Sequence, residues 1–291
     1  MKTAFTFAVL TCNRLHYLKN CVNSVLEFVG LDDIQLLIID NCSVEPGVTE
    51  FLAGLPKEIH IKRFGDRHSC ELYRAMNYAI DFAEQSGSAY INFIQDDYQY
   101  LYKHPKMLDW VHDAFSAHKN AAQVQTNMVW KRKHHKIGRI TPLDVNGVKW
   151  FRLEDKAMTD NGFTRLSVYK RTGKYPTNLG KPGTTSFKAE SWFAQKCRNL
   201  KYKRLMLGWP NMAMMMDCAY IRGNERRGRY FAPPNEYYLK PFATDDIIEV
   251  HKQCERNNMC FIEEMAKPDG WEPETLLKHS ERDTREILNA V

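Results

Sequence analysis

The decapeptide Ala89-Tyr90-Ile91-Asn92-Phe93-Ile94-Gln95-Asp96-Asp97-Tyr98 decides how the rest of this chain is organised. Its residues 90–94 are typical of a buried β-strand, and two adjacent carboxylates follow them directly. Adjacent side chains on an extended chain point to opposite sides, so Asp96 and Asp97 cannot both continue into the core. One can face the hydroxyl groups of a ligand and the other a cation, because Mg²⁺ and Mn²⁺ take oxygen ligands and share them with phosphates. The stretch therefore predicts a metal–diphosphate site at the carboxyl end of a central strand, with a solvated turn as the alternative.

Strands and helices are predicted to alternate on the N-terminal side of this stretch. Short runs of β-forming residues predict the strands, and apolar residues at helical spacing predict the helices between them. The predicted strands are 5–10, 34–39 and 59–64, and the predicted helices are 15–29, with Asn13 as its N-cap, 48–55 and 71–84. This alternation predicts an α/β fold with a mostly parallel central sheet and right-handed crossovers.

Polar clusters stand at three of the predicted strand ends. Ligands of parallel α/β sheets bind beyond the carboxyl ends of the strands. The clusters are Thr11-Cys12-Asn13-Arg14, Asp40-Asn41-Cys42-Ser43 and Gln95-Asp96-Asp97. Because these ends meet at one edge of the sheet, we expect the three clusters to form one site.

The second half of the chain has a less regular pattern. A helix over 105–117, a strand over 123–130, a strand over 164–170 and a helix over 188–200 are predicted, followed by terminal helices over 247–254 and 274–288. Asn146-Gly147 between two apolar runs predicts a β-hairpin. The basic run 131–136 predicts a solvated loop.

Composition excludes several classes of protein. With 44% hydrophobic and 26% charged residues, the 291-residue chain is ordinary globular protein, and its net charge of +6 suits anionic small molecules or an acidic membrane surface. None of the eight cysteines forms a C-x-x-C pair, which argues against structural zinc and for thiols in a reducing cytosol. No glycine precedes Gly30, so the glycine-rich phosphate loop of a nicotinamide dehydrogenase or a nucleotidylyltransferase is missing. Residues 4–10 predict a strand rather than a signal peptide, and no apolar run is long enough for a membrane span.

Five short motifs, in this order along the chain, resemble those of glycosyltransferase family 2, an inverting family with the Rossmann-like GT-A fold. They are Val9-Leu10-Thr11-Cys12-Asn13-Arg14, Ile39-Asp40-Asn41-Cys42-Ser43, Ala75-Met76-Asn77-Tyr78-Ala79, Phe93-Ile94-Gln95-Asp96-Asp97 and Ala189-Glu190-Ser191-Trp192. Gln95 replaces the first acid of the family's Asp-x-Asp signature, and Ser191 replaces the second acid of its later Glu-Asp motif. The resemblance extends over residues 3–100 and, more weakly, to about residue 205.

The resemblance implies roles for individual residues. Thr11 and Arg14 would lie near the nucleotide, Asp40 would bind its base, Asp96 its ribose, and Asp97 a Mn²⁺ or Mg²⁺ ion at the diphosphate. The remaining residues expected to bind the nucleotide are Asn13, Asn41, Arg74 and Asn77. Glu190 is expected to deprotonate the acceptor hydroxyl, and Asp160 is the rival carboxylate for that task.

The resemblance implies an inverting, metal-assisted glycosyltransferase that takes a nucleoside-diphosphate sugar, with a UDP-sugar as first candidate. Residues 1–130 would bind the donor and 131–225 the acceptor within one GT-A domain, and 226–291 would form a helical extension. The expected acceptor is a glycan, lipid-linked or protein-linked hydroxyl, and no nucleic acid is expected. Residence in the cytoplasm is expected, with peripheral membrane contact and oligomer formation left open. The alternative is a GT-A-like protein that binds nucleotide or glycan without turnover.

Overall fold

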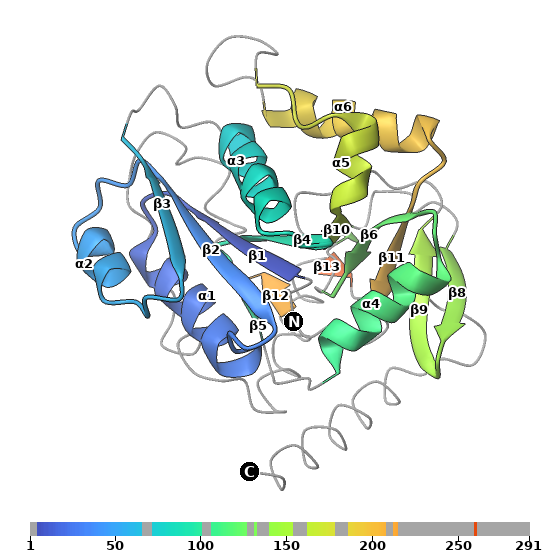
Figure 1. Ribbon diagram of the computed structural model, residues 1–291, viewed down its shortest axis with the longest axis horizontal. Helices are drawn as coiled ribbons and strands as arrows, with labels where there is room; N and C mark the ends of the chain where they lie inside the picture. The colour runs from blue at the N-terminus through green and yellow to red at the C-terminus, as the bar shows by residue number, and fades with distance from the viewer. Residues whose placement is uncertain are drawn as a thin grey trace, which may run out of the picture.

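A nine-stranded sheet forms the centre of the computed structural model, in the order β3-β2-β1-β4-β10-β6-β11-β9-β8 (Figure 1). The structure describes residues 5–65, 72–100, 106–126, 131–132, 140–153, 162–177, 186–207, 212–214 and 259–260. Strands β10 and β9 run against the other seven strands of this sheet. The sheet is therefore mixed but mostly parallel, which confirms the predicted fold class.

The first half of the chain forms the four parallel strands at one side of the sheet. The strands are β1 (Phe5–Thr11), β2 (Ile34–Asn41), β3 (His60–Phe64) and β4 (Tyr90–Gln95). The helices between them are α1 (Leu15–Phe28), α2 (Val48–Ala53) and α3 (Leu72–Gln85). The predicted alternation of strand and helix is confirmed here, with ends that differ by one or two residues.

The second half continues the same sheet. Strand β10 (Gly162–Arg165) runs antiparallel between β4 and β6 (Ala121–Gln125), and β11 (Lys203–Leu207) pairs parallel with β6. The hairpin of β8 (Ile140–Val145) and β9 (Val148–Leu153) closes the far side. Its turn residues have φ values of 52° at Asn146 and 81° at Gly147, which confirms the predicted Asn-Gly hairpin.

Helices cover both faces of the sheet (Figure 1). One hydrophobic layer contains α1 and α2 beside β1 and β2, and α4 (Met107–Ala117) beside β6 and β8, with buried residues such as Phe7, Leu18 and Val111. The other layer holds α3, α5 (Leu166–Thr172) and α6 (Ser186–Asn199), through residues such as Ile39 and Phe93. Burial on both faces explains why the central strands are almost continuously apolar.

The predicted strand over 164–170 is wrong in its second half. The strand ends at Arg165, and Leu166 begins α5. Leu166, Tyr169 and Thr172 are buried at a spacing of three residues, and the Tyr169 ring stacks on Phe193 of α6 at 5.1 Å. Packing against a neighbouring helix has therefore overridden the β-propensity of this segment.

Four shorter strands complete the described chain, in two pairs. Strand β5 (Tyr98–Tyr100) follows Asp97 directly and pairs antiparallel with β12 (Met212–Met214). Strand β7 (Lys131–Arg132), the start of the predicted basic loop, pairs with β13 (Met259–Cys260). The predicted helices over 247–254 and 274–288 lie outside the described residues. Among the helices that can be described, none has the length and apolarity needed to cross a membrane.

Candidate active site

Strands β1, β2 and β4 end at the same edge of the sheet. Thr11 is opposite Asp40 on β2, and Leu10 is opposite Gln95 on β4. The Asp96 backbone N–H then donates to the Leu10 carbonyl over 3.1 Å, which fixes the turn after β4 against the end of β1. The three polar clusters expected from the sequence therefore lie next to one another.

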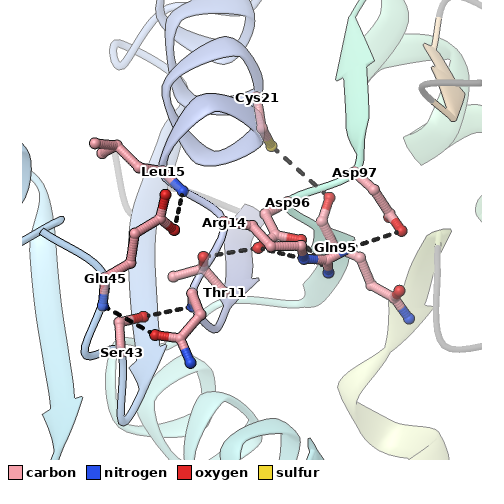
Figure 2. Close-up of polar contacts among 10 residues, drawn as sticks. Thr11, Arg14, Leu15, Cys21, Ser43, Glu45, Gln95, Asp96 and Asp97 are labelled. Carbon is pink, nitrogen blue, oxygen red and sulfur yellow. Dashed lines mark hydrogen bonds and ion pairs between the residues drawn. The ribbon is translucent and has the colours of Figure 1, made fainter. Parts of the chain in front are cut away.

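Arg14 lies between the two carboxylates that follow β4. Its Nε donates to Asp96 Oδ2 and its Nη1 donates to Asp97 Oδ2, each over 3.2 Å (Figure 2). A further ion pair joins its Nη2 to Asp96 Oδ1, and the Thr11 hydroxyl donates to Asp96 Oδ2 over 2.7 Å. Both carboxylate side chains are 0% exposed, whereas the Arg14 side chain is 15% exposed. We call these four residues, Thr11, Arg14, Asp96 and Asp97, the strand-end network.

The charged groups of the strand-end network are largely buried from solvent. Burial raises the pKa of the Asp96 carboxyl to about 6; the Arg14 guanidinium opposes this rise and the adjacent Asp97 carboxylate adds to it. Two neighbouring carboxylates of low exposure require positive charge close by. Arg14 supplies such a charge here. A cation that binds together with the ligand, or that comes from the solvent, could also supply a positive charge.

Asp40 has a separate set of partners on the β2 side of this edge. Its Oδ1 accepts the Ser43 backbone N–H over 3.0 Å, and its Oδ2 accepts Arg63 Nε over 2.8 Å. Arg63 also donates from Nη1 to the Thr49 hydroxyl over 2.9 Å. Sequence analysis missed Arg63, because the parallel register of β2 and β3 that places it opposite Asp40 is not fixed by the predicted order of the strands.

Asn13 joins the loop after β1 to the loop after β2. Its Oδ1 accepts the backbone N–H groups of Val44 and Glu45 over 2.6 and 3.1 Å, and its own N–H donates to Ser43 Oγ over 2.8 Å. Its φ of 53° suits asparagine better than most residues. The side chain thus holds the two loops in register.

The predicted N-cap at Asn13 is wrong, because α1 begins at Leu15 and the residue before it is Arg14. Arg14 is at the N-cap position and makes no capping hydrogen bond with its side chain. Instead, the Glu45 carboxylate reaches across from the second loop and accepts the Leu15 backbone N–H over 2.9 Å (Figure 2). A contact between residues 30 positions apart replaces the usual local cap.

The other expected site residues lie at different places. Asn41 is the last residue of β2 and is partly buried. The Arg74 guanidinium lies 5.2 Å from the Phe64 ring. The Asn77 amide is engaged with Tyr175, donating to its carbonyl over 2.7 Å and accepting its N–H over 3.0 Å.

Of the two candidates for the catalytic carboxylate, one belongs to the described residues. Glu190 is partly buried on α6, directly after the buried Ala189. Asp160 lies outside the described residues.

The carboxylates of Asp96 and Asp97 fit a Mg²⁺ or Mn²⁺ ion. Their oxygens are hard ligands, and their burial favours a counter-charge. In the described ranges, no group of three or more His, Cys, Asp or Glu side chains is arranged to hold a metal ion. Mg²⁺ usually binds through one or two carboxylates, with water and substrate phosphates as its other ligands, so a pair is sufficient.

Comparison with known proteins identifies the family. The model of "Glycosyl transferase family 2" matches residues 6–171, more than half of the chain. The chain belongs to glycosyl transferase family 2. This assignment confirms the resemblance seen in the five motifs and the enzyme class predicted from them. A search of curated protein sequences gave no significant match to this family 2 chain.

One solved structure of S. aureus TarS is similar in fold to this family 2 chain. The structure of TarS 1–349 in complex with UDP has a TM-score of 0.51 and 13% identity, over 73% of this chain and 60% of that one. The structure of TarS 1–349 has a TM-score of 0.48 and 15% identity, over 74% of this chain and 60% of that one. The structure of TarS has a TM-score of 0.49 and 13% identity, over 75% of this chain and 37% of that one. The family 2 chain thus spans less than two thirds of each of these TarS chains. The GT-A architecture expected from the sequence is confirmed.

Proposed function

We propose that this family 2 glycosyltransferase moves a sugar from a nucleoside-diphosphate sugar to an acceptor hydroxyl, with inversion at the sugar carbon. The observation that carries this proposal is the buried strand-end network at the carboxyl ends of β1 and β4. It combines hydrogen-bonding groups for a ribose with carboxylates that suit a cation, at the sheet edge where α/β folds bind ligands. UDP is the first candidate nucleotide, since the similar TarS 1–349 was solved in complex with UDP.

The donor would use the three strand ends in the roles that the family resemblance implies. Asp40, oriented by Arg63 and the Ser43 N–H, would accept a hydrogen bond from the base. Asp96, oriented by the Thr11 hydroxyl, would bind the ribose. Asp97 would hold Mn²⁺ or Mg²⁺, which when bound neutralises charge on the departing diphosphate.

The acceptor side of the proposal depends on a carboxylate base. Glu190 is the first candidate, and Asp160 the second. Proton removal by a positioned carboxylate contributes about 10²–10⁴-fold to the rate. We propose a glycan, lipid-linked or protein-linked hydroxyl as acceptor, bound by residues 131–225, with the donor bound by residues 1–130.

Thermal unfolding with added nucleotides tests the donor site. UDP, GDP and other nucleoside diphosphates are added with and without Mn²⁺; a ligand at 100 times its Kd adds about 2.7 kcal/mol to the unfolding free energy. For a chain of this size that corresponds to a rise of about 5–10 °C in the midpoint. No metal-dependent rise with any nucleotide would refute the site.

A matched pair of variants sharpens the test. Asp97→Asn keeps the shape of the buried side chain but removes the charge proposed to hold the cation, so the metal-dependent part of the rise should disappear. Asp33→Asn removes a carboxylate from an exposed position and should behave as the wild type. Transfer assays across nucleotide sugars then identify the donor.

A further inference from the structure

Arg14 contacts carboxylate oxygens that could bind a cation. Its Nη1 contacts Asp97 Oδ2, and its Nε and Nη2 contact the two oxygens of Asp96. Both carboxylate side chains are 0% exposed, whereas the Arg14 side chain is 15% exposed, so solvent reaches Arg14 but not the two carboxylates. A cation from solvent can therefore reach Asp97 only after side chains around it move.

A guanidinium and a divalent cation cannot bind the same two carboxylates side by side at low cost. Their positive charges repel at contact distance, and the repulsion is stronger in a poorly hydrated place than in water. Arg14 also contacts three oxygens of this pair that could bind the cation, Asp97 Oδ2 and both oxygens of Asp96. Binding of the cation to this pair therefore requires Arg14 to give up at least part of its contacts.

Arg14 is well placed to make that exchange. It is the N-cap residue of α1, with φ −145° and ψ 59°, so it stands before the regular helix and on the loop that follows β1. Its planar guanidinium matches a phosphate as well as a carboxylate, through paired N–H donors. A donor diphosphate at this edge offers it new partners.

We propose that Arg14 stands in for the cation in the free enzyme and moves to the diphosphate when donor and cation bind together. This inference rests on the proposed function. It makes Arg14 a positioning residue that couples the two ligands: the cation binds weakly alone, the diphosphate draws Arg14 away, and each ligand then raises the affinity for the other by the same factor.

Titration of Mn²⁺, followed by the electron paramagnetic resonance of the free ion, measures this coupling directly. In Arg14→Gln, Mn²⁺ alone should bind at least tenfold more tightly than to the wild type. The factor by which UDP raises the Mn²⁺ affinity should fall at least tenfold. Arg63→Gln is the matched control for the binding of Mn²⁺ alone, without UDP, because Arg63 also pairs with a buried strand-end aspartate, Asp40, and should leave that affinity unchanged.

Thermal unfolding gives a second readout without nucleotide. Arg14→Gln leaves two buried carboxylates short of positive charge, so its midpoint should fall, and Mn²⁺ should restore it. The loss caused by Arg63→Gln should not be restored. If Arg14→Gln does not fold, Arg14→Lys, which keeps the charge without the planar fork, should bind Mn²⁺ alone with an affinity above that of the wild type.

The outcomes separate this inference from the function on which it rests. If the wild type binds UDP with Mn²⁺ but neither Arg14 variant binds Mn²⁺ alone more tightly, the role of Arg14 is overturned and the donor site stands. If the wild type binds neither ligand in any combination, both are overturned.

Discussion

Gly162→Ala is the substitution whose cost can be worked out most directly from the structure. Gly162 is the first residue of β10, opposite Phe93 of β4, and has a φ of +111°. A Cβ added there would lie 2.9 Å from the carbonyl oxygen of Val124 and 3.0 Å from Cγ of Gln125. Both contacts are with β6, the strand on the other side of β10.

Two terms set the magnitude. A side chain at such a φ costs about 1–3 kcal/mol of backbone strain. Overpacking against a strand that cannot withdraw costs about 1–3 kcal/mol more, because the atom that is met belongs to the backbone of the sheet. Alanine offsets about 0.4–1 kcal/mol of this by restricting the unfolded chain. The net loss in unfolding free energy should be about 2–5 kcal/mol.

Gly30→Ala supplies the control for strain alone. Gly30 has a φ of +79°, and no atom lies within 4 Å of the Cβ that alanine would add. The loss in unfolding free energy caused by Gly30→Ala should be about 1 kcal/mol. Thermal unfolding followed by circular dichroism should show midpoints lowered by about 5–15 °C for Gly162→Ala and about 2–4 °C for Gly30→Ala. Equal losses in the two variants would refute the claim that β6 blocks the added methyl group.

Three other substitutions test the loops and the base. Asn13→Ala removes the acceptor of two backbone N–H groups and should lower the unfolding free energy by about 1–3 kcal/mol; no change in a urea titration would contradict that role. Glu45→Gln should cost up to about 1 kcal/mol at low salt and less at high salt, since it removes the charge at the start of α1; a loss independent of salt would exclude the charge as the cause. Glu190→Gln should keep the midpoint shift by nucleotide and Mn²⁺ but lower transfer by about 10²–10⁴-fold, and unchanged turnover would reassign the base.

The parallel half of the fold could be predicted because its residues repeat one simple rule. Strands β1, β2 and β4 are almost continuous apolar runs that end in polar clusters, and the helices between the strands have apolar residues at helical spacing. The rule also located the strand-end network, since parallel strands bring their carboxyl ends to one edge. The rule gave the wrong result for α5, because its sequence fits two patterns. Thr164, Leu166 and Val168 alternate as in a strand. Leu166, Tyr169 and Thr172 repeat at the spacing of a helix. Only the packing against α6 decides between the two.

Contacts between distant residues were beyond prediction. Neither the pairing of Arg63 with Asp40 nor the capping of α1 by Glu45 leaves a local pattern, because the partners are 23 and 30 positions apart. Arg14 was expected near the nucleotide from its motif, but its contacts with both carboxylates depend on the register of β1 and β4.

The Glu45 carboxylate, which accepts the first N–H group of α1, affects how a diphosphate could be bound. In many nucleotide-binding α/β proteins the first helix points its free N–H groups at the phosphates, and glycines let the backbone come close. Here Glu45 already neutralises that helix end, and the preceding loop holds no glycine. An anionic ligand at this sheet edge has to draw its counter-charge from side chains and dissolved ions, whose supply varies with the surroundings, rather than from the fixed dipole of the helix.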